Sequence, residues 1–499
     1  NTAFLTEKMF HAMIESGILP EGAVQLVCGS TGNLLDLLDC QDSVAFTGSA
    51  STGQYLKSNK NIMQNSVRFT MEADSLNCSI LTPDAMPDTP EFEFYVKEIV
   101  KEMTVKCGQK CTAIRRVIVP RELMTSVADA VSARLQKIAI GNPQSEDVRM
   151  GSLASESQRK EVRERVEELS KYAELIYGDP NQIVTVDADA ENGAFISPIL
   201  LACDDPFEKS GVHDIEAFGP VSTLMPYDSL DDAAKLANLG QGSLVGSIFG
   251  HDDDNVSELV MQTACYHGRM VLINRDNAKA STGHGSPLPH LVHGGPGRAG
   301  GGEEMGGKRG VMHYMQRTAL QGTPTTISKI CNKYIGNAKQ TQPPKHPFRL
   351  YFEELEIGHT LISDSRTITL EDIEKFADLS GDKFYAHMDE DSAAANPFFD
   401  GRVAHGYFIV SMAAGLFVEP APGPVLANYG IDELRFTEPV YPEDDLTVRL
   451  TCKQKSYRRG KGYGEVRWDI AITNQDDVIV AQYDILTMVA SKYEEFNDD

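Results

Sequence analysis

The sequence SVAFTGS at residues 43–49 decides the fold class of the first part of the chain. Its β-branched and aromatic residues predict a strand, and the turn that follows leads into a helix-like segment from Ser51. Further strands are predicted at residues 23–27 and 66–70, with helix-like stretches between them. Strands and helices that alternate in this way indicate parallel strands joined by crossover helices. We therefore predict the second half of an open α/β sheet over residues 1–80.

Length, charge and cysteine content narrow the class of protein. A chain of 499 residues is too long for one ordinary core, and its net charge of −26 argues against nucleic acid as a partner. Nine scattered cysteines, no apolar run that could span a bilayer and no signal-peptide pattern in residues 1–10 favour a cytoplasmic protein without a membrane partner. The chain opens at Asn1 directly in a helix-like stretch, so we expect a further N-terminal portion to precede it.

Changes of pattern divide the rest of the chain. Residues 81–335 carry a second α/β pattern. Eight glycines between Gly294 and Gly307 predict a loop, which we interpret as a pocket lining because the spacing fits no phosphate-binding Walker motif. The polar segment 336–347, with three prolines, is predicted to be a linker. Residues 348–499 then form a separate domain, in which alternating apolar residues at 466–472 mark a half-buried antiparallel strand.

Two residues of the first part suit chemistry at a carbonyl group. Cys111 stands in GQKCTA at residues 108–113, and a thiolate is a strong nucleophile toward carbonyl carbon. It needs local activation, because an ordinary thiol is only slightly ionised near neutral pH. Glu72 lies at the end of the third predicted strand, where a carboxylate can activate water to release a thioester. Cys107 and Cys111 lack a second pair of ligands, so we predict no metal site and treat Cys107 as a packing residue.

Four motifs in this order resemble the signatures of the aldehyde dehydrogenase family: FTGS at 46–49 with Gly53, Glu72, GQKCT at 108–112, and EAFGPV at 216–221. The resemblance implies that Cys111 forms a thiohemiacetal with an aldehyde and that Glu72 is the general base for thioester hydrolysis. It also implies a partial Rossmann-like cofactor domain over residues 1–80 and a catalytic domain over residues 81–335.

The same resemblance implies a site for NAD or NADP. Gly48 and Ser49, near a helix start, match a contact to the pyrophosphate, which agrees with anion binding at helix N-termini. Glu216 and Phe218 match the contacts to the nicotinamide ribose and ring.

Departures from the family pattern leave alternatives open. The family usually has Gly-Gly-Lys after the catalytic Glu, whereas this chain has Ala73-Asp74-Ser75, so the backbone beside the base is expected to differ. The oxyanion-hole Asn and the adenosine-ribose contacts of the family fall before residue 1. Since one lost oxyanion donor costs roughly 10²–10³ in rate, the printed chain is expected to oxidise aldehydes poorly, unlike an intact parent. One alternative is therefore a hydratase only, with the dehydrogenase part as a scaffold.

A second set of residues suits the addition of water to an unsaturated thioester. Asp382 and His387 follow a helix with a predicted capping box at Thr369 and Asp372, and an Asp and a His five apart on a loop can act on one water. The reaction also needs a donor to the thioester oxygen as enolate charge develops. The backbone amide of Gly406, at the start of an apolar helix, is the predicted donor.

This part resembles the R-specific enoyl-CoA hydratases of the MaoC-like hotdog family. The resemblance covers roughly residues 346–490 and rests on GDKFYAH at 381–387, Ala393, AHG at 404–406 and PVYP at 439–442. It implies an α+β hotdog domain with Asp382 and His387 as the catalytic dyad, and a CoA thioester as substrate. His405 is interpreted more as a hydrogen-bonding residue at the helix entry than as a catalytic one. The family usually has Asn-Pro where this chain has Phe384-Tyr385, so we hypothesise a pocket for a cyclic acyl group.

Together, the two parts resemble the bifunctional ring-opening enzymes of phenylacetate catabolism. That resemblance implies hydration of oxepin-CoA to an aldehyde, oxidation of the semialdehyde with NADP rather than NAD, and a hexamer. A homo-oligomer is also expected because both kinds of domain tend to self-pair, and two independent two-fold contacts generate a closed assembly. The alternative substrates are another CoA-linked semialdehyde or a linear enoyl-CoA.

Overall fold

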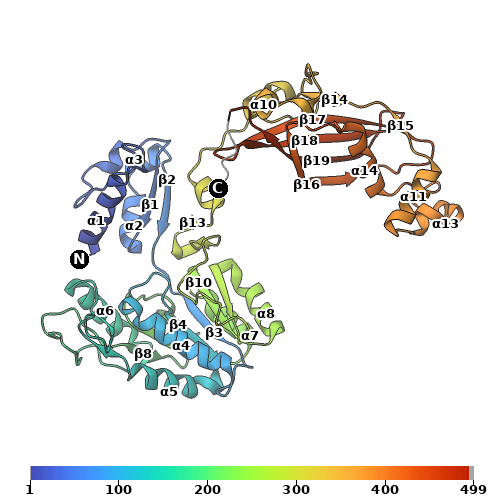
Figure 1. Cartoon of the computed structure of the whole chain (residues 1–499). Coiled ribbons are helices and arrows are strands. Elements are labelled where there is room, and N and C mark those ends of the chain that lie inside the picture. The colour runs from blue at the N-terminus through green and yellow to red at the C-terminus, as the bar shows by residue number, and fades with distance from the viewer. Residues whose placement is uncertain (1, 494–499) are drawn as a thin grey trace. The chain divides into compact units, whose positions relative to one another are not determined.

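The computed structural model describes residues 2–493, which form two compact units, 1–316 and 317–499 (Figure 1). The division therefore does not coincide with the predicted linker at 336–347. The chain before and within that segment lies on unit 2. The Tyr334 amide, two residues before it, donates to the Lys453 carbonyl at 2.7 Å, and Thr341 within it forms a β-bridge with His359. Polar composition predicted a free linker, but these backbone groups are satisfied by the neighbouring sheet.

Unit 1 begins with a small two-stranded parallel sheet. Strands β1 and β2 pair in register, so that Thr47 lies opposite Glu72 at their carboxyl ends. The elements here are α1 (Thr2–Glu15), β1 (Ser43–Thr47), α2 (Ala50–Lys57), α3 (Lys60–Gln64) and β2 (Arg68–Glu72). The predicted strand at residues 23–27 is wrong, because the structure has an exposed irregular segment there. Within residues 2–493 no strand pairs with it, and a strand needs a neighbour for its backbone groups.

The larger part of unit 1 is a sheet of seven strands in the described residues, in the order β11-β10-β3-β4-β9-β8-β7. All its neighbours are parallel except β7 and β8. The strands are β3 (Cys78–Leu81), β4 (Arg116–Pro120), β7 (Glu174–Tyr177), β8 (Ile199–Ala202), β9 (Val221–Tyr227), β10 (Ser243–Phe249) and β11 (His267–Ile273). Central strands β4, β9 and β10 are buried along their whole length, as expected for a parallel sheet covered by helices.

Amphipathic helices supply that cover. Their buried positions recur at helical spacing, for example Val127, Val131 and Leu135 of α5, which join one apolar core. The helices are α4 (Pro90–Thr104), α5 (Met124–Leu135), α6 (Glu156–Leu169), α7 (Leu230–Asn238) and α8 (Asp253–Thr263). Short pairs β5 (Ala139–Ile140) with β6 (Val148–Met150), and β12 (Val292–His293) with β13 (Glu304–Met305), precede α9 (Lys308–His313).

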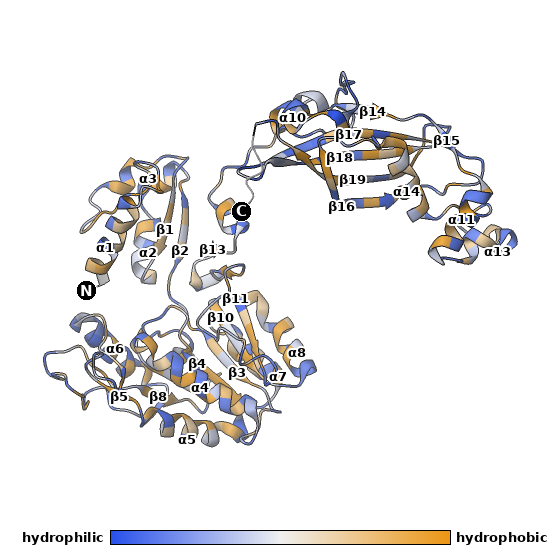
Figure 2. Cartoon of the chain, viewed as in Figure 1, coloured by the Kyte–Doolittle hydropathy of each residue, from blue (hydrophilic) through white to orange (hydrophobic). Residues whose placement is uncertain are grey.

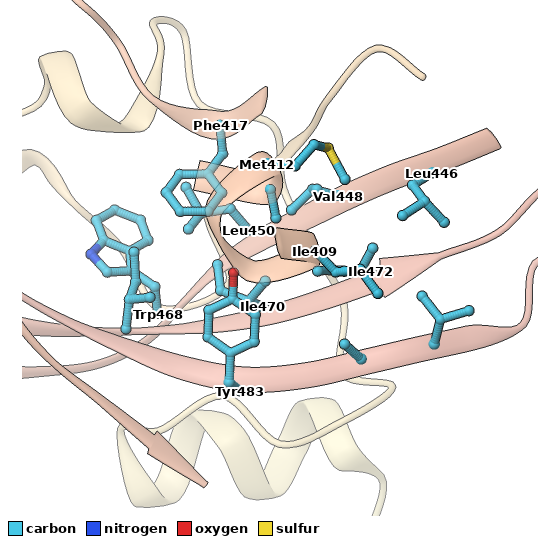
Figure 3. Packing of buried hydrophobic residues seen from close by; sticks show 14 of the residues in the cluster. Ile409, Met412, Phe417, Leu446, Val448, Leu450, Trp468, Ile470, Ile472 and Tyr483 are labelled. Carbon is cyan, nitrogen blue, oxygen red and sulfur yellow. The ribbon is translucent and has the colours of Figure 1, made fainter. Parts of the chain in front are cut away.

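Unit 2 is an antiparallel sheet wrapped around one apolar helix. The sheet runs β14-β17-β18-β19-β16, with β15 paired to β17. Its elements are α10 (Pro324–Cys331), β14 (Thr360–Ile362), β15 (Arg366–Thr367), α11 (Leu370–Ser380), α12 (Tyr385–Met388), α13 (Glu390–Ala394), α14 (Gly406–Phe417), β16 (Val425–Phe436), β17 (Asp445–Arg458), β18 (Tyr463–Thr473) and β19 (Ile479–Ala490). Figure 3 shows Ile409, Met412 and Phe417 of α14 among side chains from the sheet, with Trp468 fully buried beside them.

Hydropathy explains why the helix lies inside this sheet. Figure 2 shows α14 as mostly hydrophobic, whereas α11 and α13 at the outer end carry hydrophilic residues. The predicted alternation at 466–472 is confirmed, since Val466, Trp468 and Ile470 all point into the core. The capping box at Thr369 and Asp372 is also present, and it fixes the start of α11. Among the residues that the structure describes, no helix has both the length and the apolar character to cross a bilayer.

Candidate functional sites

The first site brings Cys111 and Glu72 together with a residue that the sequence did not single out. His293 Nε2 lies 3.2 Å from Glu72 Oε2 and 3.8 Å from Cys111 Sγ. Glu72 is buried and Cys111 is half-buried. The three side chains come from the end of β2, the turn before β4 and strand β12, so the site joins three segments that are far apart in sequence.

A tight left-handed turn places Cys111. Lys106, Cys107 and Gly108 all have positive φ, at 53°, 55° and 66°. A Cβ on Gly108 would lie 2.3 Å from the Gly219 carbonyl oxygen, so only glycine permits this approach. Asn77 Nδ2 then donates to the Cys111 carbonyl at 2.8 Å, which ties the nucleophile's backbone to the sheet. Cys107 is buried in an apolar cluster, in agreement with a packing role.

The glycine-rich segment closes against the end of β2. Gly301 forms a parallel β-bridge with Met71. Gly300 has a φ of 102°, and a Cβ added to it would lie 1.6 Å from the Met71 carbonyl oxygen. The loop therefore packs backbone against backbone, which a side chain would prevent. Strand β12 extends from it and carries His293 opposite Glu304 of β13.

Burial and charge set the ionisation of this site. Burial, together with the nearby Glu72 carboxylate, raises the pKa of Cys111 to about 12. Burial also opposes ionisation of Glu72, but the hydrogen bond and charge of His293 prevail and lower the pKa of the carboxyl. The hydrogen bond to Glu72 raises the pKa of His293. Glu304 faces the same carboxylate, and burial with that charge raises its pKa. The arrangement holds a carboxyl group that favours its ionised form beside a thiol that favours its protonated form.

The predicted pyrophosphate contacts lie at the start of α2. Ser49 caps this helix, and its Oγ accepts from the Thr52 amide at 3.3 Å. The Gly48 amide donates to the Glu72 carbonyl at 3.1 Å, so this glycine connects the cofactor strand to the base. A Cβ on Gly48 would lie 2.6 Å from the Phe46 ring. Ser49 is exposed at a helix N-terminus, which suits an anionic group.

The predicted nicotinamide contacts meet at Arg115. Its Nε lies 3.4 Å from Glu216 Oε1, its guanidinium stands 5.5 Å from the centre of the Phe218 ring, and Nη2 donates to the Gly108 carbonyl. Burial, aided by the charge of Asp74, raises the pKa of Glu216 in spite of Arg115. Arg115 thus links these residues to the turn that carries the nucleophile.

Asp74 explains the departure from the family pattern after Glu72. Its carboxylate pairs with Arg298 of the glycine-rich segment, at 3.0 Å from Nε, and Arg298 Nη1 donates to the His213 carbonyl. The other oxygen, Asp74 Oδ1, is buried without a hydrogen-bond partner in the described residues. Two neighbouring carboxylates with an unpartnered oxygen fit a hydroxyl donor such as a ribose, so these residues are compatible with a dinucleotide.

The second site joins Asp382, His387 and His405. One polar side-chain atom from each of the three residues lies within 4.8 Å of the other two, and the two imidazoles stack at 3.8 Å between centroids. His387 Nδ1 lies 2.8 Å from the Val403 carbonyl, which favours the proton on that nitrogen and leaves Nε2 with a free lone pair. Burial and His405 lower the pKa of His387 against the effect of that carbonyl. His405 Nε2 lies 2.9 Å from the Asp382 carbonyl, so it fixes the loop rather than capping the helix.

Gly406 begins α14, where its amide is at the helix N-terminus beside His405. A Cβ there would lie 2.4 Å from the tip of the Phe436 ring, so a side chain at this position requires that ring or the helix start to move. Phe384 and Tyr385 are both exposed, with ring centroids 4.4 Å apart, and they form an aromatic surface next to Asp382. The Tyr385 hydroxyl accepts from Asn396 Nδ2 at 2.8 Å, which orients that ring.

Three residues of the first site were missed in the sequence: His293, Asn77 and Arg115. His293 and Cys111 are 182 positions apart, and no spacing rule joins them. The glycine-rich segment was the available signal, because such loops allow close backbone approach to a site. Two groups of three side chains are close enough to bind a metal ion: Glu72, Cys111 and His293, and Asp382, His387 and His405. The prediction that the protein uses no metal stays a prediction.

Comparison with known proteins agrees with this architecture. Residues 1–320 match the aldehyde dehydrogenase family, and residues 354–473 match the MaoC-like domain. The chain belongs to the aldehyde dehydrogenase family. It carries a MaoC-like domain as its second part, so the predicted fold class is confirmed for both parts.

Individual relatives span different shares of the two chains. Protein MaoC of Klebsiella aerogenes is 49% identical over 317 residues, 63% of this chain and 92% of that protein. The 3,4-dehydroadipyl-CoA semialdehyde dehydrogenase of Aromatoleum evansii is 45% identical over 295 residues, 59% of this chain and 57% of that protein. A betaine aldehyde dehydrogenase variant from Staphylococcus aureus has a similar structure, with a TM-score of 0.53, 25% identity, and coverage of 62% of this chain and 57% of that one. This aldehyde dehydrogenase thus spans little more than half the length of the last two.

Proposed function

We propose that this protein is a bifunctional ring-opening enzyme of phenylacetate catabolism. In this proposal, the MaoC-like domain hydrates oxepin-CoA, the ring opens to an aldehyde, and the dehydrogenase part oxidises that semialdehyde to the acid with NADP. The observation that carries the proposal is that two assembled sites, Cys111 with Glu72 and Asp382 with His387, occur on one chain. The name of the Aromatoleum relative supports a CoA-linked semialdehyde as the substrate.

In the dehydrogenase site, Cys111 attacks the aldehyde carbon and Glu72 later removes a proton from the water that cleaves the thioester. NADP, when bound, supplies the hydride acceptor between these two steps. Glu216 and Phe218 would hold its nicotinamide end through the Arg115 network, and Gly48 and Ser49 its pyrophosphate.

In the hydratase site, His387 Nε2 accepts a proton from water, and Asp382 orients that water or protonates the α-carbon. The amide of Gly406 stabilises the enolate oxygen. Addition of water to the enol-ether carbon of an oxepin forms a hemiacetal, which opens without further catalysis to the aldehyde. The exposed rings of Phe384 and Tyr385 suit a cyclic acyl group more than a straight chain.

Two sites on one chain favour rapid use of the reactive aldehyde that passes between them. Tethering raises the local concentration of the second site to about the millimolar range, so the aldehyde is oxidised before it reacts with amines. A cytoplasmic location is proposed because the nine scattered cysteines fit reduced thiols and the proposed substrates are CoA thioesters.

The edge of the unit 2 sheet supports a homo-oligomer, and the number of six subunits is proposed from the resemblance alone. Strand β16 pairs only with β19 in the described residues and exposes Leu426, Tyr429, Ile431 and Phe436. An exposed apolar edge strand is a site for pairing with another copy.

The test is to incubate the full-length protein with oxepin-CoA and NADP while following NADPH absorbance and the CoA-ester products. Cys111→Ala should abolish NADPH formation while the aldehyde still accumulates. Asp382→Ala should abolish both. Brisk hydration of a linear enoyl-CoA without turnover of oxepin-CoA would overturn the substrate and leave both reaction types in place.

A further inference from the structure

One imidazole nitrogen faces both predicted reacting groups of the aldehyde site. His293 Nε2 is 3.2 Å from the base Glu72 and 3.8 Å from the sulfur of Cys111. The other charged groups around the ring are Glu304 on β13 and Arg269 on β11. No other histidine in the described residues forms a contact of this kind with Cys111.

We propose that His293 is a third catalytic residue of the aldehyde site, which takes the thiol proton of Cys111 and then donates that proton as a hydrogen bond to the thiolate or to Glu72. This inference rests on the proposed aldehyde oxidation and deepens it.

The need for such a residue follows from the surroundings of Cys111. Burial and the Glu72 carboxylate both oppose formation of a second negative charge, so the thiol by itself is almost entirely protonated at neutral pH. Glu72 has a lowered pKa and is a weak proton acceptor. An imidazole whose pKa is raised by that same carboxylate is a stronger one. Proton transfer to His293 exchanges a lone buried thiolate for a thiolate paired with an imidazolium.

The proton and electron count closes over the cycle. The step starts from the neutral ring that carries its proton on Nδ1, so that Nε2 has a free lone pair. The S–H bond of Cys111 breaks and the proton moves to Nε2, which gives imidazolium and thiolate. The thiolate forms a C–S bond to the aldehyde carbon, and hydride loss to the nicotinamide leaves a thioester. Glu72 takes one proton from water, the hydroxide adds to the thioester, and the C–S bond breaks to regenerate the thiolate. The acid and one proton are released, while His293 keeps its own proton for the next cycle.

Because both contacts involve the same nitrogen, His293 cannot serve both partners fully at once. In a nucleophile–His–acid relay the two ring nitrogens face different groups. In this site a single N–H can donate either to the Cys111 sulfur or to the Glu72 carboxylate. Donation to sulfur favours the acylation half, since the thiolate is stabilised. As the thioester forms, the sulfur loses its charge and the N–H is free to turn to the carboxylate.

The backbone of the loop fixes the ring in this place. His293 pairs with Glu304 across the β12–β13 ladder, and the next residue, Gly294, is so close to its neighbours that a Cβ would lie 1.9 Å from the Gly302 carbonyl oxygen. The position of His293 is therefore set by a close contact within the same glycine-rich loop that packs against β2.

The experiment measures the alkylation rate of Cys111 by iodoacetamide against pH, read by mass spectrometry of its peptide. It uses full-length protein, wild type and two variants: His293→Phe keeps a ring without a proton, and His293→Gln keeps a donor that does not titrate. The matched control is His290→Phe, an exposed histidine three positions earlier in the same loop. We expect alkylation at pH 7 to slow about tenfold or more in both His293 variants, since one pKa unit is a factor of ten, and to be unchanged in the control.

Slowing of less than about threefold in either variant that retains the wild-type circular dichroism spectrum would overturn the proposal. If the Phe variant does not fold, the Gln variant decides. The readout needs neither aldehyde nor cofactor, so it stands even if oxepin-CoA proves not to be the substrate. Conversely, His293 variants that show normal alkylation kinetics and full oxidation of the semialdehyde would exclude a catalytic role for His293 and leave the proposed function intact.

Discussion

Gly406 illustrates how a single missing side chain can control a site. Its α-carbon hydrogen faces the Phe436 ring of β16, where a Cβ would be 2.4 Å away. An added methyl group therefore requires either the Phe436 ring or the start of α14, with the amide that we assign to the enolate oxygen, to move. We expect Gly406→Ala to lower the hydration rate at least about tenfold, because the new contact with the ring displaces that amide from the thioester oxygen.

The control for Gly406 lies in the same helix. Gly415 of α14 has nothing within 4 Å of an added Cβ, so Gly415→Ala should leave hydration unchanged. A double variant with Phe436→Leu should recover part of the loss of Gly406→Ala. Equal rates for the two alanine variants in a CoA-ester product assay would contradict this account.

The pH dependence of hydration follows from His387. The base is active in its neutral form, and burial with the adjacent His405 lowers its pKa below the ordinary 6.5. A lowered pKa keeps the imidazole neutral to more acidic pH, so the acid limb of the hydration rate should fall below pH 6.5. A limb at or above that value, measured with a linear or cyclic enoyl-CoA, would show that His387 is not the base.

Both pairs of predicted catalytic residues could be found in the sequence, whereas the residues that surround Cys111 and Glu72 could not. Cys111, Glu72, Asp382 and His387 lie in short motifs, whose chemistry is visible from residue type and spacing. His293 is different: its contact with Cys111 depends on a loop that returns to the site after most of the domain. No local pattern encodes such a contact.

Among the elements, the glycine-rich segment has the clearest role. Gly300 and Gly301 are adjacent and both have positive φ, but only Gly300 is pressed against another backbone, that of Met71. Gly300→Ala should separate the loop from β2 and lower aldehyde oxidation at least about tenfold, since misplacement near a reacting group is costly. Hydration by unit 2 should be unaffected.

Gly301→Ala is the matched control, because it introduces the same backbone strain of about 1–3 kcal/mol with open space around the new methyl group. It should retain most of the oxidation activity. If both variants lost the same activity in an NADPH assay, backbone strain alone would explain the effect and the contact with β2 would not matter.

Helices and strands were predicted correctly where the local sequence pattern agrees with the pairing that the fold provides. The helix entered at Ser49 and the strand at 466–472 form as expected, because capping and alternation act locally. The strand predicted at 23–27 has the right composition but no neighbouring strand in the described residues. A strand's existence depends on its partner, which composition does not reveal.

On the scale of the whole molecule, the boundary between the units can be tested. Tyr334 is 3% exposed and Ala338 is 7% exposed, and the Tyr334 amide bonds to the unit 2 sheet, although sequence composition placed Tyr334 before the linker and Ala338 within it. A fragment of residues 317–499 should therefore melt higher than a fragment of 348–499, by roughly 5 °C or more, because the shorter one loses a buried aromatic residue. Equal melting temperatures of the two fragments by calorimetry would show that residues 317–347 do not stabilise unit 2 and would support the predicted linker at 336–347.

The two predicted reacting groups of the aldehyde site belong to different sheets. Glu72 ends β2 of the small sheet, and Cys111 precedes β4 of the large one; residues 73–77 and the contact between Gly300 and Met71 join them. Warming should widen that seam before either sheet melts, whereas Asp382 and His387 share one local loop. Aldehyde oxidation should then fade at a temperature where circular dichroism and hydration are intact. Under the proposed function, a warmed cell would still open the ring but would no longer oxidise the product, so free aldehyde would accumulate.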